Sequence, residues 1–359
     1  MMSIRDGVLL LVFTQCLACA GLDQAPLSNP SPKWAHVPPD RSASTVLSRL
    51  LLLDRRFPAD FEKLRICVQG AKGLEGDATL LESKLSYAAW LGASGLNSES
   101  LWDKIEWVPA PRCSVEDRSF GSVIIMGDLA KPEAAQQLTT RFQPAELHCV
   151  RDAAGVNCQS NVQTLGFGGP GGLMIYQTPP DRWVRVENDA PASVVLSPYV
   201  GWKSLDQDLA SQPELLSRAL EARQRVSRLT YPECQSLVQA LTQDKLEAAP
   251  DPTFQTLFEA FAKGGPVKLD SAYAPRYSAF HVLLHEIGHQ FGMDHADNPN
   301  LDSQTGSVGN SRQRGNQWLT EVATMAYGAP FLYLTFDDRT GIADLALKLQ
   351  SLLRERTRP

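Results

Sequence analysis

The segment HEIGHQFGMDH, residues 285–295, contains three of the six histidines in the chain. Apolar residues flank them at helical spacing up to a glycine, at Phe280, Leu283, Leu284, Ile287 and Phe291. On a helix, His285 and His289 lie about 40° apart around the axis and roughly 6 Å apart along it, so both imidazoles can reach one ion. Glu286 is offset by one position, where a carboxylate can act as a base beside the metal without being forced to ligate it.

Gly292 decides whether His295 can join the same site. A helix continued to His295 would place that imidazole about 9 Å beyond His289 and on another face. Glycine accepts positive φ and can turn the chain back, so three imidazoles can converge and leave a fourth position open. This arrangement is typical of catalytic zinc. A zinc-stapled binding module without turnover is the alternative, although such a site does not need Glu286.

The pattern His285-Glu286-x-x-His289-x-x-Gly292-x-x-His295 resembles the extended zinc motif of the metzincin metallopeptidases. The resemblance implies a zinc-dependent endopeptidase in which Glu286 is the general base for zinc-activated water and the substrate is a protein or peptide. It also implies an α+β fold, with a twisted mixed sheet, an active-site helix, and a zinc cleft between an upper N-terminal and a small lower C-terminal subdomain. The match is loosely matrixin-like, and no subfamily is assigned.

Two residues near position 325 extend the resemblance. Met325 in EVATMAYG matches the Met-turn, which implies that it packs beneath the histidines without binding the ion. Tyr327 matches a position that ligates zinc or stabilises the oxyanion in some members; the alternative is a tyrosine of the turn. The segment 334–349 resembles the C-terminal helix of matrixin-type and serralysin-type members.

Three further features allow more than one interpretation. PRCSVED around Cys113 resembles the matrixin cysteine switch, in which a thiolate occupies the fourth zinc position; a disulfide with Cys67 or a coincidental turn is the alternative. His281 lies one turn before His285, as a partner of the site or as a partly buried histidine with a local hydrogen bond. Residues 294–303 offer oxygen ligands suited to Ca²⁺, but their spacing favours a solvated polar loop.

The N-terminus has the composition of an export signal. Residues 1–20 combine Arg5, an apolar stretch and a small-x-small cleavage pattern, and residues 21–56 form a linker rich in Pro and Ser. We therefore expect a secreted or cell-envelope protein, with a bacterial lipoprotein anchored at Cys19 as the alternative. No other segment is expected to cross a membrane. The net charge of −6 gives no reason to expect nucleic-acid binding, and the oligomeric state stays open.

In an oxidising compartment most cysteines pair. Cys149 and Cys158 flank a segment with turn character, so a local hairpin disulfide is predicted. Removal of the first 20 residues leaves an odd number of cysteines, so one thiol stays unassigned.

The pattern becomes globular from about residue 57, and the resemblance implies one metallopeptidase domain over 57–359. It begins with the order strand, helix, strand, strand at 63–70, 76–95, 105–110 and 121–129. Helices are expected at 213–229, 231–247 and 252–263. The glycine-rich segment 165–176 lacks the ending of a phosphate loop and is predicted to be a flexible loop, within a potential insertion at about 131–230.

Overall fold

The computed structural model of the 359-residue chain describes the residues that build its core. The described residues are 46–54, 62–71, 74, 76–128, 142, 147–152, 155–160, 164–169, 171, 175–178, 182–185, 190–244, 276–293, 313–314, 317–318, 323–325 and 331–355.

A mixed five-stranded sheet forms the centre of the fold. Its strands, in spatial order, are β2 (Ile105–Pro109), β1 (Leu64–Gln69), β3 (Ser122–Ile125), β9 (Ala192–Leu196) and β6 (Gly166–Gly169). The first four run parallel to one another, whereas β6 runs antiparallel to β9. The α+β class and the mixed sheet are therefore confirmed. The four elements predicted at 63–70, 76–95, 105–110 and 121–129 occur in that order, but an unpredicted helix at 46–54 precedes them and another at 98–102 lies between the second and the third.

The strands alternate between two packing layers. Ile124 and Val194 point to the large core that the helices cover, whereas Val123 and Val195 point to a smaller cluster on the opposite face. This period of two is what a sheet buried on both faces requires.

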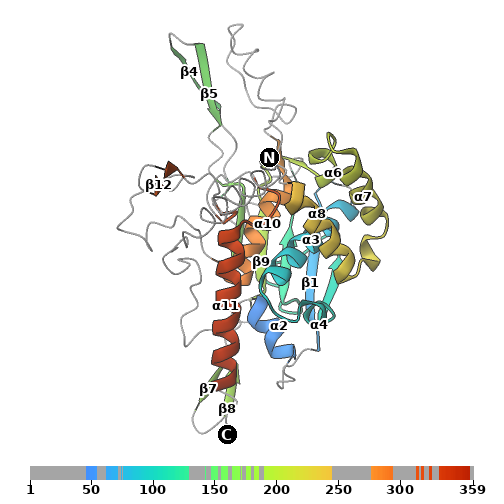
Figure 1. Cartoon of the computed structure of the whole chain (residues 1–359), viewed down its shortest axis with the longest axis vertical. Helices are drawn as coiled ribbons and strands as arrows, with labels where there is room; N and C mark the ends of the chain where they lie inside the picture. The colour runs from blue at the N-terminus through green and yellow to red at the C-terminus, as the bar shows by residue number, and fades with distance from the viewer. Residues whose placement is uncertain are drawn as a thin grey trace, which may run out of the picture. The chain divides into compact units, whose positions relative to one another are not determined.

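Two long helices lie side by side on the large core. These are α3 (Gly76–Ala93) and α10 (Ala279–Phe291); α10 also contacts β6 and β9, and α3 contacts β1 (Figure 1). Every described side chain of α3 from Ala78 to Leu91 is buried, because other helices pack around it. Those neighbours are α4 (Ser98–Trp102), α7 (Pro213–Gln224), α8 (Tyr231–Asp244) and α11 (Phe336–Glu355). A further helix, α2 (Val46–Asp54), contacts α10, α4 and α11.

The remaining elements are short. They are the hairpin strands β4 (Leu147–Asp152), β5 (Gly155–Ser160), β7 (Ile175–Thr178) and β8 (Arg182–Arg185), the paired strands β10 (Gly201–Lys203), β11 (Arg276–Ser278), β12 (Gln313–Arg314) and β13 (Gln317–Trp318), and the helices α6 (Leu205–Asp208) and η1 (Val226–Arg228). In the β4–β5 hairpin, Cys149 is the direct cross-strand partner of Cys158, the register that the predicted disulfide needs. The predicted helix at 252–263 lies outside the described residues.

Three predictions about chain organisation were wrong. Residues 46–54 do not belong to a linker but form α2, whose leucines are buried in the core. Residues 166–169 are not a flexible loop, because β6 pairs with β9 and packs on α10. The potential insertion at 131–230 is too broad, since β6 and β9 are part of the main sheet and α7 and α8 pack on α3.

The cysteine-switch interpretation of Cys113 was also wrong. Cys113 forms a disulfide with Cys67 of β1, so its sulfur is not available as a zinc ligand. Cys234 of α8 is a free thiol, and it is buried with 1% exposure. Burial raises its pKa to about 12, which keeps the thiol protonated and unreactive.

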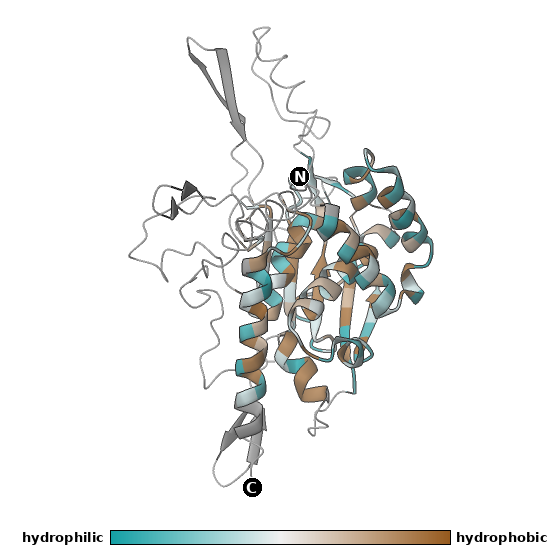
Figure 2. Ribbon diagram, in the orientation of Figure 1, coloured by the Kyte–Doolittle hydropathy of each residue, from teal (hydrophilic) through white to brown (hydrophobic). Residues whose placement is uncertain are grey.

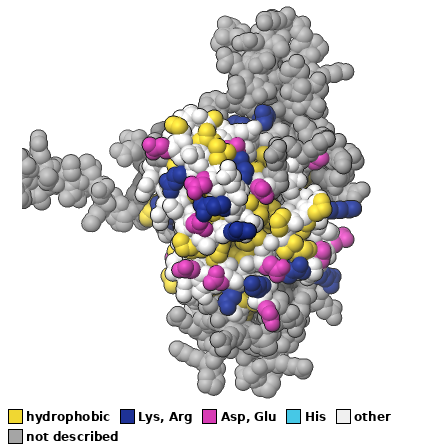
Figure 3. All heavy atoms as spheres, turned by 90° about the vertical axis from the view of Figure 1, so that its right-hand side faces the viewer, with side chains coloured by type: hydrophobic (Ala, Val, Ile, Leu, Met, Phe, Trp, Pro, Cys, Tyr) yellow, Lys and Arg dark blue, Asp and Glu magenta, His cyan; other side chains and the backbone are white. Residues whose placement is uncertain are grey.

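The described surface carries charges of both signs, with apolar side chains between them (Figure 2, Figure 3). In Figure 2, polar residues predominate on the outer helices α6 and α7. Figure 3 shows acidic and basic side chains interspersed on this face of the described residues. No described helix is long and apolar enough to span a bilayer.

Candidate metal centre

Helix α10 carries the predicted site, and both of its ends are fixed. Its apolar side is fully buried against α3 and the sheet, at Phe280, Leu283, Leu284, Ile287 and Phe291. Ser278 caps its N-terminus, because the hydroxyl accepts from the His281 N–H at 3.2 Å and donates to the Asp208 carboxylate of α6.

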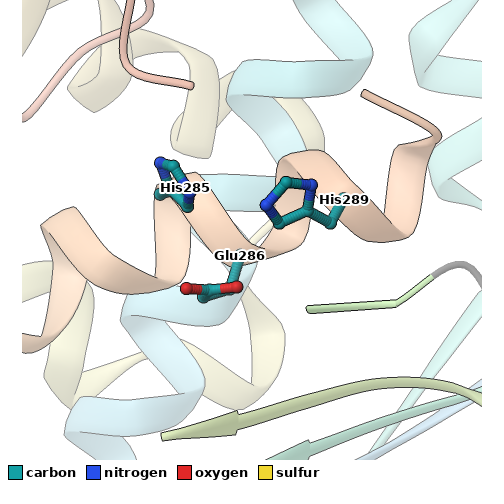
Figure 4. Close-up of side chains that lie close together, drawn as sticks. All are labelled: His285, Glu286 and His289. Carbon is teal, nitrogen blue, oxygen red and sulfur yellow. The ribbon is translucent and has the colours of Figure 1, made fainter. Parts of the chain in front are cut away.

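His285, Glu286 and His289 form the one group among the described residues with the spacing of a metal site. One ligand atom from each lies within 4.8 Å of the other two. The two imidazole rings are 5.1 Å apart and close to perpendicular, at 81°. Figure 4 shows both rings beside each other along α10, with the carboxylate next to them.

The hydrogen bonds of the two imidazoles fix their tautomers. His285 Nδ1 lies 2.7 Å from the Thr324 carbonyl oxygen, and His289 Nδ1 lies 2.7 Å from that of Met293. A carbonyl can only accept, so each Nδ1 carries the proton and donates it. Each Nε2 is therefore left with a lone pair for a metal ion, as in most protein sites that bind metal through histidine.

Gly292 ends α10 in the way that the sequence predicts. Its φ is +101°, and its N–H donates to the His289 carbonyl at 3.1 Å while the Met293 N–H donates to Gly288 at 2.9 Å. These two bonds form a Schellman motif. The same turn brings the Met293 carbonyl to His289, so it both ends the helix and orients a candidate ligand.

Glu286 is buried between the helix and the sheet. Its side chain is 7% exposed, and its carboxylate accepts a hydrogen bond from the Gly168 N–H of β6. Burial raises its pKa to about 8, and the bond from Gly168 opposes that shift. Burial therefore favours the protonated form of this carboxyl group.

A second layer of contacts holds the Thr324 carbonyl in place. The buried Asp338 carboxylate of α11 accepts from the Thr324 and Met325 N–H groups at 2.8 and 3.1 Å. It also accepts from the N–H and the hydroxyl of Thr335, both at 2.9 Å. Burial raises the pKa of Asp338, although these bonds act against the shift. A chain of contacts therefore links Asp338 through Thr324 to His285.

Met325 packs directly on α10 at Gly288, the residue before His289. It is fully buried, and a Cβ built on Gly288 would lie 2.3 Å from its sulfur. Trp90 of α3 lines the same spot, at 2.6 Å from that Cβ, and its indole N–H donates to the Leu284 carbonyl at 2.8 Å. Position 288 therefore has no room for a side chain.

Buried polar contacts also tie α10 to α3 and to the sheet. The Tyr87 hydroxyl donates to Gln290 Oε1 at 2.7 Å and lies 2.9 Å from the Ser122 hydroxyl. Gln290 Nε2 donates to the Val123 carbonyl at 3.4 Å. These contacts fix the rotation of α10, and with it the direction in which the two imidazoles point.

Several predicted residues are not part of the described group. His281 is half-buried one turn before His285, and burial lowers its pKa to about 4, so it is neutral. His295, Tyr327 and the oxygen-rich segment 294–303 lie outside the described residues, as do the export signal and Cys19.

Two parts of the site were missed by sequence reasoning. The sequence shows no strand pattern at Gly166–Gly169, because glycine has low strand propensity and the segment pairs with a distant strand. Asp338 did leave a signal: Thr335-x-x-Asp338 before an apolar periodic run is a helix N-terminus pattern. That pattern places the carboxylate at the start of α11, but only the fold brings the Met325 turn to it.

Comparison with known proteins gives no match: no family model, no curated protein and no solved structure matches this chain. What the chain does is therefore inferred from its own residues.

Proposed function

We propose that this protein is a zinc-dependent endopeptidase of metzincin-like architecture, with His285, His289 and His295 as ligands and Glu286 as the general base. The observation that carries the proposal is the paired orientation of His285 and His289, whose Nδ1 atoms are both bound to backbone carbonyls. Nitrogen ligands in this arrangement suit zinc.

The residues present fit such an ion. Two Nε2 lone pairs lie on one side of α10, and the positive φ of Gly292 turns the chain sharply just before His295. A bound zinc ion would supply a Lewis acid that lowers the pKa of water and favours the ionised form of a neighbouring carboxylate.

Glu286 would move the proton in this reaction. In the proposed role, its carboxylate takes the proton of the attacking water and returns it to the leaving amine. A purely structural zinc site gains nothing from a buried carboxylate, which costs free energy to desolvate. Its presence favours a hydrolase over a zinc-stapled binding module. Tyr327 is proposed to stabilise the oxyanion, and Met325 to support the ligands from below.

The experiment compares the exported chain with Glu286→Ala in casein cleavage, with bound zinc assayed in both. We expect one zinc per chain in each protein and a loss of activity of about 10²- to 10⁴-fold in the variant. Glu221→Ala, an exposed change on α7, is the matched control and should keep full activity.

Two outcomes would contradict the proposal. Zinc without cleavage in the parent would favour the binding module. A well-folded parent without zinc would exclude the metal site itself.

A further inference from the structure

The strand β6 presents glycine to the metal-site helix at alternate positions. A Cβ built on Gly166 would lie 2.7 Å from both Cγ and Oε1 of Glu286. A Cβ on Gly168 would lie 2.3 Å from the Glu286 carbonyl oxygen and 2.9 Å from the His289 Cβ. Real Cβ atoms essentially never approach so closely, so a side chain at either position would displace the residue that it faces.

The other face of β6 holds the strand against the sheet. Phe167 packs against the smaller apolar cluster, which includes Val195 and Ile125. Backbone pairing with β9 sets Gly166 opposite Leu196 and Gly168 opposite Val194. The strand β6, at the edge of the sheet, is thus held by pairing with β9 and by Phe167, and it forms a wall on one side of the Glu286 carboxylate.

The wall also supplies a donor. The Gly168 N–H donates to the Glu286 carboxylate, which on its other side lies beside the imidazoles of His285 and His289, with one ligand atom of each within 4.8 Å. A carboxylate with two rotatable bonds beyond Cβ needs such a contact to keep one orientation.

We propose that β6 is a positioning element for Glu286: the Gly168 N–H orients the carboxylate, and Gly166 keeps free the space that the carboxylate occupies. The catalytic consequence rests on the function proposed above, but the contact itself does not. In this role both glycines act through Glu286 and take no part in proton transfer.

The kinetic test uses the full exported chain with Gly166→Ala, and with Gly169→Ala as the matched control. A Cβ at Gly169 meets only Phe167 Cε1, at 3.8 Å, which is ordinary contact. We expect Gly166→Ala to lower kcat for casein cleavage by about 10²-fold, with KM and zinc content unchanged, because about 1 Å of misplacement costs this much. Gly169→Ala should stay within about twofold of the parent.

A double-mutant cycle identifies the residue through which Gly166 acts. In a Glu286→Ala background, Gly166→Ala should cause no further loss, because the group that it displaces is gone. Equal activity of Gly166→Ala and Gly169→Ala would overturn the proposal. Loss of zinc in Gly166→Ala would also overturn it, since the strand would then act on the ligands.

A second measurement needs neither zinc nor substrate. In a sample labelled with carbonyl-¹³C phenylalanine and ¹⁵N glycine, NMR can select the glycine amides that directly follow a phenylalanine, and the sequence contains three such Phe-Gly pairs. The signal that disappears in Phe167→Leu is the Gly168 amide. In Glu286→Ala the exchange of this amide should become about tenfold faster, because it has lost its acceptor. An unchanged Gly168 amide would overturn the proposed contact. An inactive parent with the expected exchange result would instead refute only the proposed function.

Discussion

At the scale of single residues, the site depends on groups that never touch a metal. Each imidazole is oriented by a backbone carbonyl, and each carbonyl is held by another contact: a helix-ending turn for Met293 and the Asp338 carboxylate for Thr324. Outer partners of this kind set the tautomer and the ring orientation of ligands.

Asp338→Asn tests this outer layer. Asparagine keeps one acceptor oxygen but replaces the other with a donor, which then faces the N–H groups of the turn. We expect zinc affinity to fall by about 10- to 100-fold, measured by competition with a chelator, because the Thr324 carbonyl is no longer held for His285. Asp344→Asn, six residues further along α11, should leave affinity unchanged. Equal affinities in both variants would show that Asp338 does not orient His285.

Buried charge at the residue scale also predicts a pH dependence of stability. Glu82 of α3 is fully buried; its Oε1 accepts from the Leu205 N–H at 2.6 Å, and its Oε2 has no partner among the described residues. Burial raises its pKa from 4.5 to about 8, the Leu205 bond and nearby Arg223 oppose this, and Asp206 and Asp208 add to it.

The direction of the pH effect on stability follows from proton binding to Glu82. Between about pH 4.5 and pH 8 the folded chain holds a proton on Glu82 that the unfolded chain releases, so this contribution to stability is full below pH 4.5 and is lost as pH rises through 8. Glu82→Gln removes the titration. We expect it to be more stable than the parent above pH 8 by at least about 1 kcal/mol, since one pKa unit is worth about 1.4 kcal/mol.

Urea unfolding at pH 5, 7 and 9 measures this difference. The advantage of Glu82→Gln over the parent should shrink or reverse at pH 5, where the parent carboxyl is protonated. Glu221→Gln, at an exposed position on α7, should show no such trend. A difference that stays constant with pH would mean that Glu82 does not titrate in this range.

At the scale of elements, the turn after α10 both ends the helix and places the Met293 carbonyl against His289. Gly292→Ala should cost about 1–3 kcal/mol of unfolding free energy, because alanine is strained at a φ of +101°. It should also weaken zinc binding, since the Met293 carbonyl moves away from His289.

Gly95→Ala separates these two effects. Gly95 follows α3 with a φ of +70° and has no atom within 4 Å of a built Cβ, so it carries the same backbone strain far from the histidines. We expect a similar shift in the thermal midpoint but unchanged zinc affinity. If both variants lost zinc alike, the loss would reflect general instability and not the turn.

Elements also show where sequence reasoning works. The sequence predicted α10 with its glycine end, and also β1, α3, β2 and β3, because each is encoded by local periodicity and local turn chemistry. It failed for β6, whose Gly-Phe-Gly-Gly strand is defined by a distant partner strand and by the helix beneath it. It failed for α2 because that helix directly follows a segment rich in Pro and Ser and is only nine residues long.

At the scale of the whole molecule, the core is built without the metal. The apolar cluster extends from α2 through α3 and the sheet to α10 and α11, and the Cys67–Cys113 disulfide closes a separate part of the fold. Helix α10 is fixed at its N-terminal cap, by Trp90 and through Gln290. The two described candidate ligands, His285 and His289, are therefore held in place by packing and hydrogen bonds.

Metal removal tests this independence. After chelation, the far-UV circular dichroism spectrum should stay native while casein cleavage is lost, and added zinc should restore activity. Zinc should raise the thermal midpoint by mass action alone, because binding adds about 4 kcal/mol to the unfolding free energy at a free concentration 1,000 times Kd. A chain that lost its helical signal on chelation would behave as a structural zinc protein, in which binding energy is folding energy. The buried contacts of α10 argue against that behaviour, since each of them is made by protein groups alone.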